Sequence, residues 1–284
     1  MSLAALRSPD YLLIGHVTRD LVSAGERPGG TVTYAGLTAS AWGLAVAAVT
    51  SCAAEQDLHE LSGLRLFRIP AAYTTTFENT YQGAAREQIL HHVAERLTPA
   101  AVPLEWRTAR IVHLAPVADE VDLGLMHHFP QSFVGVTPQG WLRVWDASGR
   151  VRRRAPEAQL LDALRAASAC IVSVEDVQGD ERIIAQLVEH CPITAVTENA
   201  QGARVYWNGH VRNFPAPRVE MRDPTGAGDI FAACFFARLD ETHDPWEAAR
   251  AATLLASASV ARVGLAGIPS REDVARSRPV VEQP

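Results

Sequence analysis

The sequence of 284 residues contains no lysine, and all 26 of its basic residues are arginine. This absence excludes a Walker A phosphate loop, which needs a lysine after its glycines, and any reaction through a lysine Schiff base. Cysteine is scarce as well: four residues are widely spaced, and no CxxC pair occurs. Structural zinc and a disulfide framework are therefore not expected, and the four thiols are predicted to be buried and free.

Basic runs and long apolar runs are also missing. The net charge is −6, so nucleic acid and anionic membranes are poor candidate partners. No segment has membrane-spanning length without charges or helix breakers, and the N-terminus lacks a secretory signal pattern, so we expect a cytoplasmic protein. With 48% apolar residues, the chain can form the core of one large α/β domain over residues 1–284.

Short apolar runs alternate with helical patterns along most of the chain. Continuous apolarity is typical of parallel strands covered on both faces, so the alternation predicts a doubly wound, mostly parallel sheet flanked by helices. The predicted strands are 11–15, 46–50, 111–114, 133–136, 170–174 and 193–197, and the predicted helices are 121–128, 157–167, 180–189, 227–239 and 245–263. Asn208-Gly209, between the runs 204–207 and 211–214, predicts a β-hairpin.

Residues 73–96 break this alternation. Polar and aromatic residues alternate from Thr74 to Tyr81, Gln82-Gly83 has the composition of a turn, and 86–92 suits a returning strand. This two-sided polarity predicts a small exposed sheet outside the core, a reduced β lid. A surface hairpin without any role has the same pattern, so the sequence alone leaves both interpretations open.

The stretch from Asp223 to Asp229 reads Asp-Pro-Thr-Gly-Ala-Gly-Asp and precedes an apolar helical run. Small residues at such a helix start leave backbone N–H groups exposed to an anion, above all a phosphate. Asp229 adds a carboxylate beside that site, which is an arrangement suited to phosphoryl transfer with a general base. A glycine-rich turn whose aspartate only caps the helix is the alternative without catalysis.

This string resembles the DTxGAGD signature of the ribokinase family, the PfkB-type carbohydrate kinases. The resemblance implies a ribokinase-like fold and an ATP-dependent kinase. In such a kinase Asp229 is the general base, and the amides of Gly226, Ala227 and Gly228 form the anion hole. It also implies Mg²⁺ and, as in many members, a monovalent cation such as K⁺ near the Asp223 strand and the loop 264–269.

The resemblance extends to the acceptor side of the site. Asp20 matches an aspartate that binds substrate hydroxyls, and Gly29-Gly30 matches a glycine pair that opens a helix, with Tyr34 in place of the usual asparagine. Ribokinases place a lid hairpin between these two motifs, but only eight residues separate Asp20 from Gly29, so that hairpin is expected to be short or absent. The polar contacts expected around a polyol come from Asn79 and Arg86, and the apolar cover comes from Phe77 or Tyr34.

The donor side departs further from the family pattern. The NxxE motif, which organises magnesium, falls at Ser173 to Asp176 with serine for asparagine and aspartate for glutamate. Asp176 is the expected metal-side carboxylate and Glu175 is the competing candidate, while a solvated acidic loop is the alternative. Asn199 stands where a glycine is usual, and asparagine tolerates positive φ. The expected nucleotide-binding residues are Thr197, Asn199, Gly202, Asp223, Thr225, Gly226, Gly228, Ala256 and Gly264.

Within the family, three stretches resemble plant-type myo-inositol kinases and their bacterial relatives. They are 74–81, 136–144 and the phosphate turn with Pro224. An inositol-like polyol or a small sugar is therefore the favoured acceptor. A nucleoside kinase stays open, because Tyr73, Phe77 or Tyr81 could serve as a stacking platform.

A non-catalytic pseudokinase that binds sugar or nucleotide also stays open, because the segment Ser173 to Asp176 and the position of Asn199 depart from the family pattern. A nucleotide-binding dehydrogenase is excluded by the lack of GxGxxG after the first strand. A monomer or a homodimer is expected.

Overall fold

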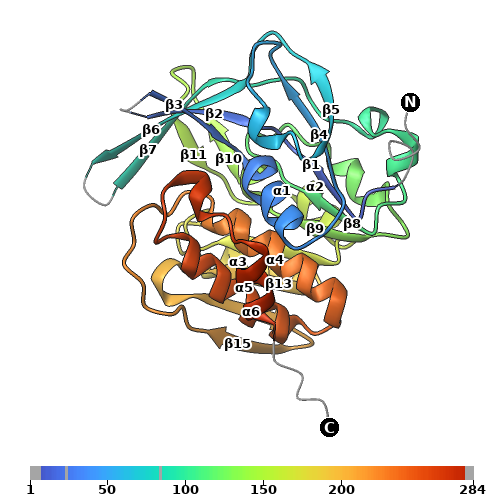
Figure 1. The fold of residues 1–284 in the computed structure, drawn as a ribbon, viewed down its shortest axis with the longest axis vertical. Coiled ribbons are helices and arrows are strands. Elements are labelled where there is room, and N and C mark those ends of the chain that lie inside the picture. The colour runs from blue at the N-terminus through green and yellow to red at the C-terminus, as the bar shows by residue number, and fades with distance from the viewer. Residues whose placement is uncertain (1–7, 23–24, 83–84, 279–284) are drawn as a thin grey trace.

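A nine-stranded sheet forms the centre of the computed structural model, which describes residues 8–22, 25–82 and 85–278 (Figure 1). The strand order is β15-β14-β13-β12-β9-β8-β1-β4-β5, and every pair is parallel except the two that involve β14. The strands are β1 (Tyr11–Ile14), β4 (Val46–Cys52), β5 (Arg65–Pro70), β8 (Ile111–Leu114), β9 (Phe133–Val136), β12 (Ala169–Ser173), β13 (Ile193–Thr197), β14 (Ala203–Trp207) and β15 (His210–Phe214).

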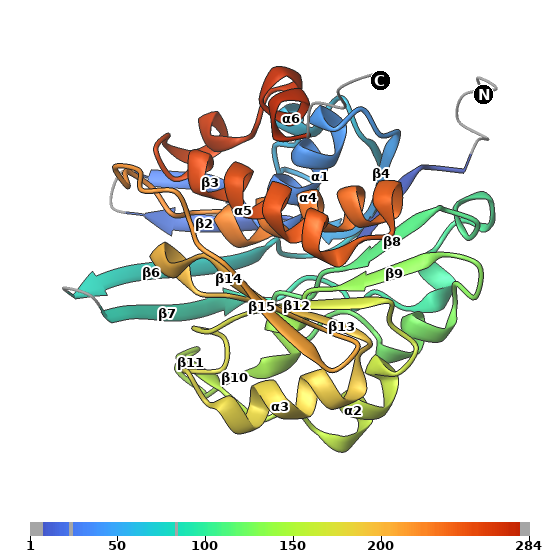
Figure 2. The ribbon, with the colours of Figure 1, turned by 90° about the horizontal axis from the view of Figure 1, so that it is seen from below.

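Helices cover both faces of this sheet, as Figure 2 shows. One layer contains α1 (Thr31–Ala41), α4 (Ala227–Thr242), α5 (Pro245–Ser259) and α6 (Arg271–Ser277), and the other contains α2 (Ala158–Leu164) and α3 (Glu181–His190). Along β1, Tyr11 and Leu13 belong to the core cluster that includes α4, whereas Leu12 and Ile14 belong to the opposite cluster. Successive strand residues point to opposite faces, so a strand covered on both sides must be apolar throughout.

A second sheet of four strands projects from the central sheet (Figures 1 and 2). Its order is β3-β2-β6-β7, with β2 (Thr18–Val22), β3 (Gly25–Gly29), β6 (Thr75–Gln82) and β7 (Ala85–His92). Two antiparallel hairpins, β2–β3 and β6–β7, are joined by a parallel pairing of β2 with β6. We call these four strands the lid. Two further strands, β10 (Arg143–Trp145) and β11 (Val151–Arg153), form a small ribbon beside it.

The doubly wound sheet, its six predicted strands and the Asn208-Gly209 hairpin are confirmed. The prediction of a helix over 121–128 was wrong: Leu123–His127 is a short 3-10 helix that begins where the Asp122 carboxylate accepts the Gly124 amide. The hairpin between Asp20 and Gly29 is short but present, so the lid has four strands and is larger than the 73–96 segment. The sequence analysis also missed β5, β10, β11 and α6.

In the part of the chain that the structure describes, all four cysteines are buried and free, as predicted. None of the described helices has the length and apolar character needed to cross a bilayer.

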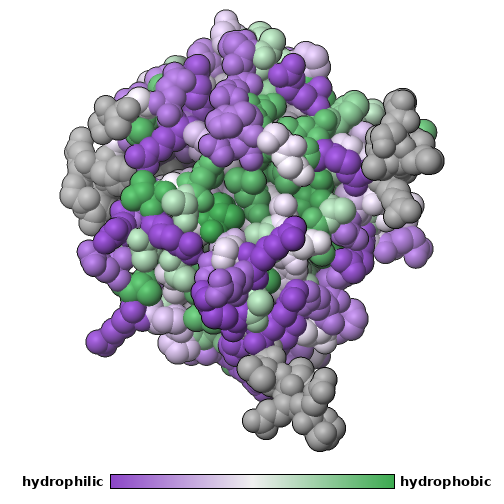
Figure 3. All heavy atoms as spheres, viewed as in Figure 1, coloured by the Kyte–Doolittle hydropathy of each residue, from purple (hydrophilic) through white to green (hydrophobic). Residues whose placement is uncertain are grey.

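In the orientation of Figure 1, hydrophobic residues gather across the middle of the face, over the region of α1, with hydrophilic residues above and below (Figure 3).

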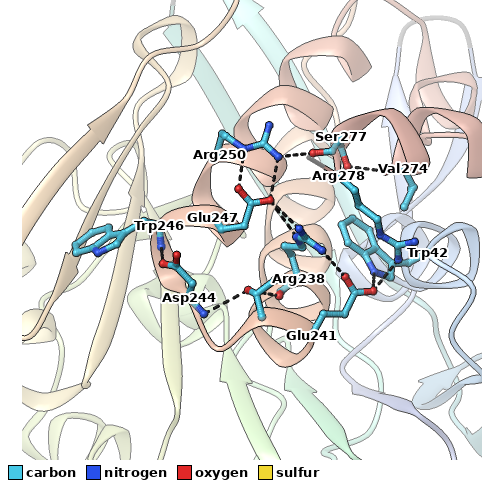
Figure 4. A network of polar contacts seen from close by, with 11 residues as sticks. Trp42, Arg238, Glu241, Asp244, Trp246, Glu247, Arg250, Val274, Ser277 and Arg278 are labelled. Carbon is cyan, nitrogen blue, oxygen red and sulfur yellow. Dashed lines mark hydrogen bonds and ion pairs between the residues drawn. The ribbon is translucent and has the colours of Figure 1, made fainter. Parts of the chain in front are cut away.

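A polar network centred on Glu241 joins four helices of one layer (Figure 4). Its carboxylate accepts hydrogen bonds from Trp42 Nε1 at 2.7 Å, Arg278 at 2.6 Å and Arg238 at 3.0 Å. Arg238 also donates to Glu247 on α5, and the Arg278 guanidinium lies 5.2 Å from the Trp42 ring centroid. The ends of α1, α4, α5 and α6 are thus tied together by one set of partly buried charges.

We expect Glu241→Ala to destabilise the fold by about 1 to 3 kcal/mol, because three donors lose their common acceptor. Glu272→Ala is the matched control, because Glu272 also accepts from an arginine but is 80% exposed in its side chain, where ion pairs contribute little. Urea unfolding measures both variants. Equal midpoints for the two variants would contradict a stabilising role for the network.

Candidate active site

The predicted anion turn lies immediately before α4. Gly226 is the N-cap residue of that helix with φ 78°, a left-handed conformation that favours glycine. The Asp223 carboxylate accepts the Thr225 amide at 2.9 Å and the Gly264 amide at 2.9 Å, so it fastens the turn to the loop after α5. The Ala227 amide donates to Pro224 O at 3.2 Å, which leaves the amides of Gly226 and Gly228 as the better candidates for an anion.

Tyr34 packs directly against this turn. A Cβ atom on Gly226 would lie 2.1 Å from Tyr34 Cδ1, so only glycine permits the contact. Tyr34 is 3% exposed, and its burial together with the carboxylates of Asp223, Asp229 and Asp20 raises the pKa of its hydroxyl. The aromatic residue that replaces the family's asparagine therefore lies between the acceptor side and the anion turn, with its hydroxyl protonated at neutral pH.

Asp229 is the third residue of α4 and lies at the centre of the site. Its side chain retains some solvent contact, yet protein atoms enclose the carboxyl closely, and this desolvation raises its pKa from 3.8 to about 6. A hydrogen bond from the Thr31 side chain and the charge of Arg143 lower the pKa, while Asp176 and Asp20 raise it. The carboxyl is therefore mostly ionised at pH 7 but is a stronger base than an ordinary aspartate.

One face of the lid carries the predicted acceptor residues. Asp20 is in register with Phe77 on β6, and Asn79 lies two residues further along the same face. Gln88 donates to Asn79 Oδ1 at 2.9 Å, so these two amides form a pair on the lid. The side chain of Arg86 lies outside the described residues.

The two glycines of the Gly29-Gly30 motif have packing roles of their own. A Cβ on Gly29 would lie 2.5 Å from the Asp20 carboxylate, and a Cβ on Gly30, at φ 82°, would lie 2.4 Å from His16 O. A glycine pair at such a position could also leave bare backbone for the close approach of a substrate. In the structure, the space beside these glycines holds the Asp20 carboxylate and the turn that leads into β2.

Phe77 is not an open aromatic surface. It is 3% exposed and packs with Leu90, Val117 and Ala118. The Arg143 guanidinium lies 5.5 Å from its ring centroid and donates to Val117 O at 2.9 Å. A nucleobase therefore has no free face of this ring on which to stack. Tyr73 is 58% exposed, but its ring stacks on His92 at 4.3 Å.

The donor side joins the loops that follow β12 and β13. Asn199 donates to the Glu175 carboxylate at 2.9 Å, and its φ of 52° confirms that asparagine adopts the left-handed turn in place of glycine. Gly202 has φ 99°, and a Cβ there would lie 2.0 Å from Phe214 O. Thr197 ends β13, and Ala256 is half-buried on α5.

Asp176 is 6% exposed and already has three donors. Gln139 and Arg153 bind its Oδ1 at 2.9 and 3.0 Å, and the Ser173 amide binds Oδ2 at 3.1 Å. Magnesium in proteins often keeps several waters and needs few direct carboxylates. A carboxylate with this many partners fits an indirect contact, through water, with a magnesium ion carried by the donor phosphates. Glu175 is more exposed and fits the same role.

Four groups at the site were missed by the sequence analysis. Thr31 hydrogen-bonds to Asp229, Arg143 lies over the Phe77 ring, Arg153 pairs with Asp176, and Arg27 lies 3.5 Å from Asp223. Thr31 directly follows the Gly29-Gly30 motif, so its position at the helix start was a usable signal. No local pattern indicates which arginines face the site, because strands from distant parts of the chain bring them there.

Comparisons with known proteins find kinases among the similar sequences. A model described as "pfkB family carbohydrate kinase" matches residues 157–271. The cytidine kinase of Thermococcus kodakarensis is 26% identical over 250 residues, which cover 80% of this chain and 87% of that protein. The inositol 3-kinase of Zea mays is 44% identical over 73 residues, but these are only 25% of this chain and 18% of that protein.

Solved structures share the fold over nearly the whole chain. A pyrophosphate-dependent kinase of the ribokinase family, complexed with a pyrophosphate analog and myo-inositol, has a TM-score of 0.77 at 22% identity and covers 94% of this chain and 99% of that one. Ribokinase from Thermotoga maritima has a TM-score of 0.71 at 18% identity, with coverage of 95% and 99%. The chain thus has the ribokinase-like α/β fold, and its residues 157–271 match the PfkB family of carbohydrate kinases.

Proposed function

We propose that the protein transfers the γ-phosphoryl group of ATP to a hydroxyl of a neutral polyol, with an inositol-like ring as the favoured acceptor. The observation that carries this proposal is the position of Asp229. Its carboxyl, with a pKa raised to about 6, lies beside the anion turn and close enough to Asp20 of the lid to feel its charge.

In this mechanism the Asp229 carboxylate accepts the proton of the acceptor hydroxyl. The hydroxyl oxygen forms a bond to the γ-phosphorus while the bond to the β–γ bridging oxygen breaks, and ADP leaves. The amides of Gly226 and Gly228 stabilise the charge on the transferring group, and Ala227 contributes less because its amide is shared with the turn. Mg²⁺ would neutralise the donor phosphates, with Asp176 or Glu175 in contact through water.

The acceptor class is proposed from the side chains on the face of the lid that carries Asp20. Asp20, Asn79 and Gln88 provide oxygen and amide groups for several hydroxyls, whereas the Phe77 ring is covered by Arg143 and is not available for base stacking. A nucleoside acceptor is the second candidate, because the likeness to a cytidine kinase extends over 250 residues. A monovalent cation near Gly264, a cytoplasmic location and a monomeric or dimeric state stay predictions.

The test measures the release of ADP or phosphate with two phosphoryl donors, Mg·ATP and pyrophosphate. The acceptors offered are inositols, hexoses, pentoses and nucleosides. Pyrophosphate is included because a structural neighbour bound to myo-inositol depends on it. Turnover with an inositol would support the proposal, whereas turnover with cytidine alone would replace the acceptor. ATP binding without turnover in any arm would favour a non-catalytic binding module.

Asp229→Asn should lower kcat by about 10² to 10⁴, because the variant cannot accept the hydroxyl proton. Asp240→Asn is the matched control, since Asp240 lies on the same helix but pairs with Arg110 at 3.3 Å, away from the turn. Steady-state kinetics with the best acceptor compare the two. Near-normal turnover of Asp229→Asn would contradict the assignment of the base.

The rate should rise with pH through about 6 and level off above it, because the base acts only when its carboxyl is ionised. Arg143→Gln should move this limb to higher pH, since the Arg143 charge lowers the pKa of Asp229. Arg154→Gln is the control: Arg154 lies near the same ribbon but binds Trp141 O and Glu157. A pH profile of kcat/KM that is identical in all three proteins would argue against Arg143 as a partner of the base.

Asp229→Asn should also stabilise the fold at pH 7.5, by about 1 to 3 kcal/mol. The pKa of Asp229 is higher in the folded protein than its ordinary 3.8, so folding favours the protonated form. The stability that this group contributes is complete below pH 4 and is lost as the pH rises through 6. Urea unfolding at pH 7.5 and at pH 4 measures the effect, and a difference that does not shrink toward pH 4 would exclude this cause.

A further inference from the structure

Arg27 is a lid residue that reaches the anion turn. It lies on β3, opposite Asp20 in the antiparallel pairing of β2 with β3, so the two side chains share one face of the lid. Its Nη1 lies 3.5 Å from Asp223 Oδ2, at the start of the phosphate turn. Arg19, on the same hairpin, alternates to the opposite face, where it pairs with Glu26 at 3.6 Å.

The ion pair between Arg27 and Asp223 is weak. The Arg27 side chain is 46% exposed, and its distance of 3.5 Å is longer than a good charged hydrogen bond. Asp223 does not depend on Arg27, because the Thr225 and Gly264 amides each bind its carboxylate at 2.9 Å. The guanidinium can therefore exchange this carboxylate for a more highly charged anion without loosening the turn.

The site also needs positive charge where the phosphoryl group would lie. Asp223 and Asp229 belong to the turn, the charges of Asp20 and Asp176 act on Asp229, and the chain has no lysine to offset these carboxylates. Arg153 is paired with Asp176, and Arg143 is anchored to Val117 O beneath Phe77. The Arg27 charge is felt at the Tyr34 hydroxyl, and the Tyr34 ring contacts Gly226, so this guanidinium lies beside the proposed anion hole.

We propose that Arg27 is a second phosphate-binding group of the active site, supplied by the lid. When the donor binds, its guanidinium leaves Asp223 and binds two oxygens of the donor's terminal phosphate, which draws β3 over the anion turn. Arginine suits this role because its planar fork matches phosphate oxygens in pairs. Arg27 forms no covalent bond, and the transfer to the acceptor proceeds as described above. The inference rests on the proposed function for its catalytic part.

The experiment compares Arg27→Gln, Arg27→Lys and the matched control Arg19→Gln. With Mg·ATP and the best acceptor, Arg27→Gln should lower kcat by about 10- to 100-fold, as expected for loss of one group that stabilises the transferring phosphoryl. Arg27→Lys should recover part of this loss, because it keeps the charge but not the fork. Arg19→Gln should stay within about twofold of the parent protein, since it lies on the outer face of the same hairpin.

A second measurement separates this proposal from the proposed function. Binding of inorganic pyrophosphate, followed by calorimetry without any acceptor, should weaken at least fivefold in Arg27→Gln and remain unchanged in Arg19→Gln. If the parent protein binds pyrophosphate through Arg27 but phosphorylates nothing, the kinase proposal fails and the phosphate site stands. Equal pyrophosphate affinity in the two glutamine variants, or no binding to the parent protein, would overturn the role of Arg27.

Discussion

The contact between Tyr34 and Gly226 holds the site together. It brings the first turns of α1 and α4 so close that no side chain larger than hydrogen fits at position 226. The left-handed conformation of Gly226 then directs the following amides outward at the start of α4. The same approach of the two helices lets the Thr31 side chain hydrogen-bond to Asp229. One close packing contact thus positions the anion turn, Asp229 and the Thr31 side chain that hydrogen-bonds to it.

Electrostatics impose the second constraint. Several carboxylates lie in or near one turn, and they differ in the hydrogen bonds and ion pairs that they make. Burial would raise the pKa of Asp223, but hydrogen bonds from the Thr225 side chain and from two backbone amides, together with the charge of Arg27, lower it. Asp176 forms an ion pair with Arg153 at 3.0 Å. Burial raises the pKa of Asp229 to about 6, because the hydrogen bond from Thr31 and the charge of Arg143 offset only part of the desolvation. Asp223 and Asp229 therefore differ in pKa because their surroundings differ.

In the proposed function, the lid supplies the groups that bind the acceptor. Its inner face presents a carboxylate, an amide pair and an arginine, while Phe77 fills the space beneath and packs on Arg143. Such a surface offers many hydrogen bonds and little open aromatic area, which suits a polyol better than a base that must stack. The lid is attached to the core at the start of β6. Thr75 hydrogen-bonds there to the buried His16 at 2.7 Å, and His16 lies just after the end of β1.

The sequence by itself determined the core strands, the αL asparagine at position 199 and the phosphate turn, because these depend on local periodicity, small residues and backbone freedom. It predicted the lid only in part, since β2 and β3 are short, β3 contains Pro28, and the pairing of β2 with β6 spans more than 50 residues. Only the tertiary structure decided which arginines face the site. Arg27, Arg143 and Arg153 resemble the other 23 arginines in local sequence, and they differ only because distant strands place their charges beside buried carboxylates or the lid.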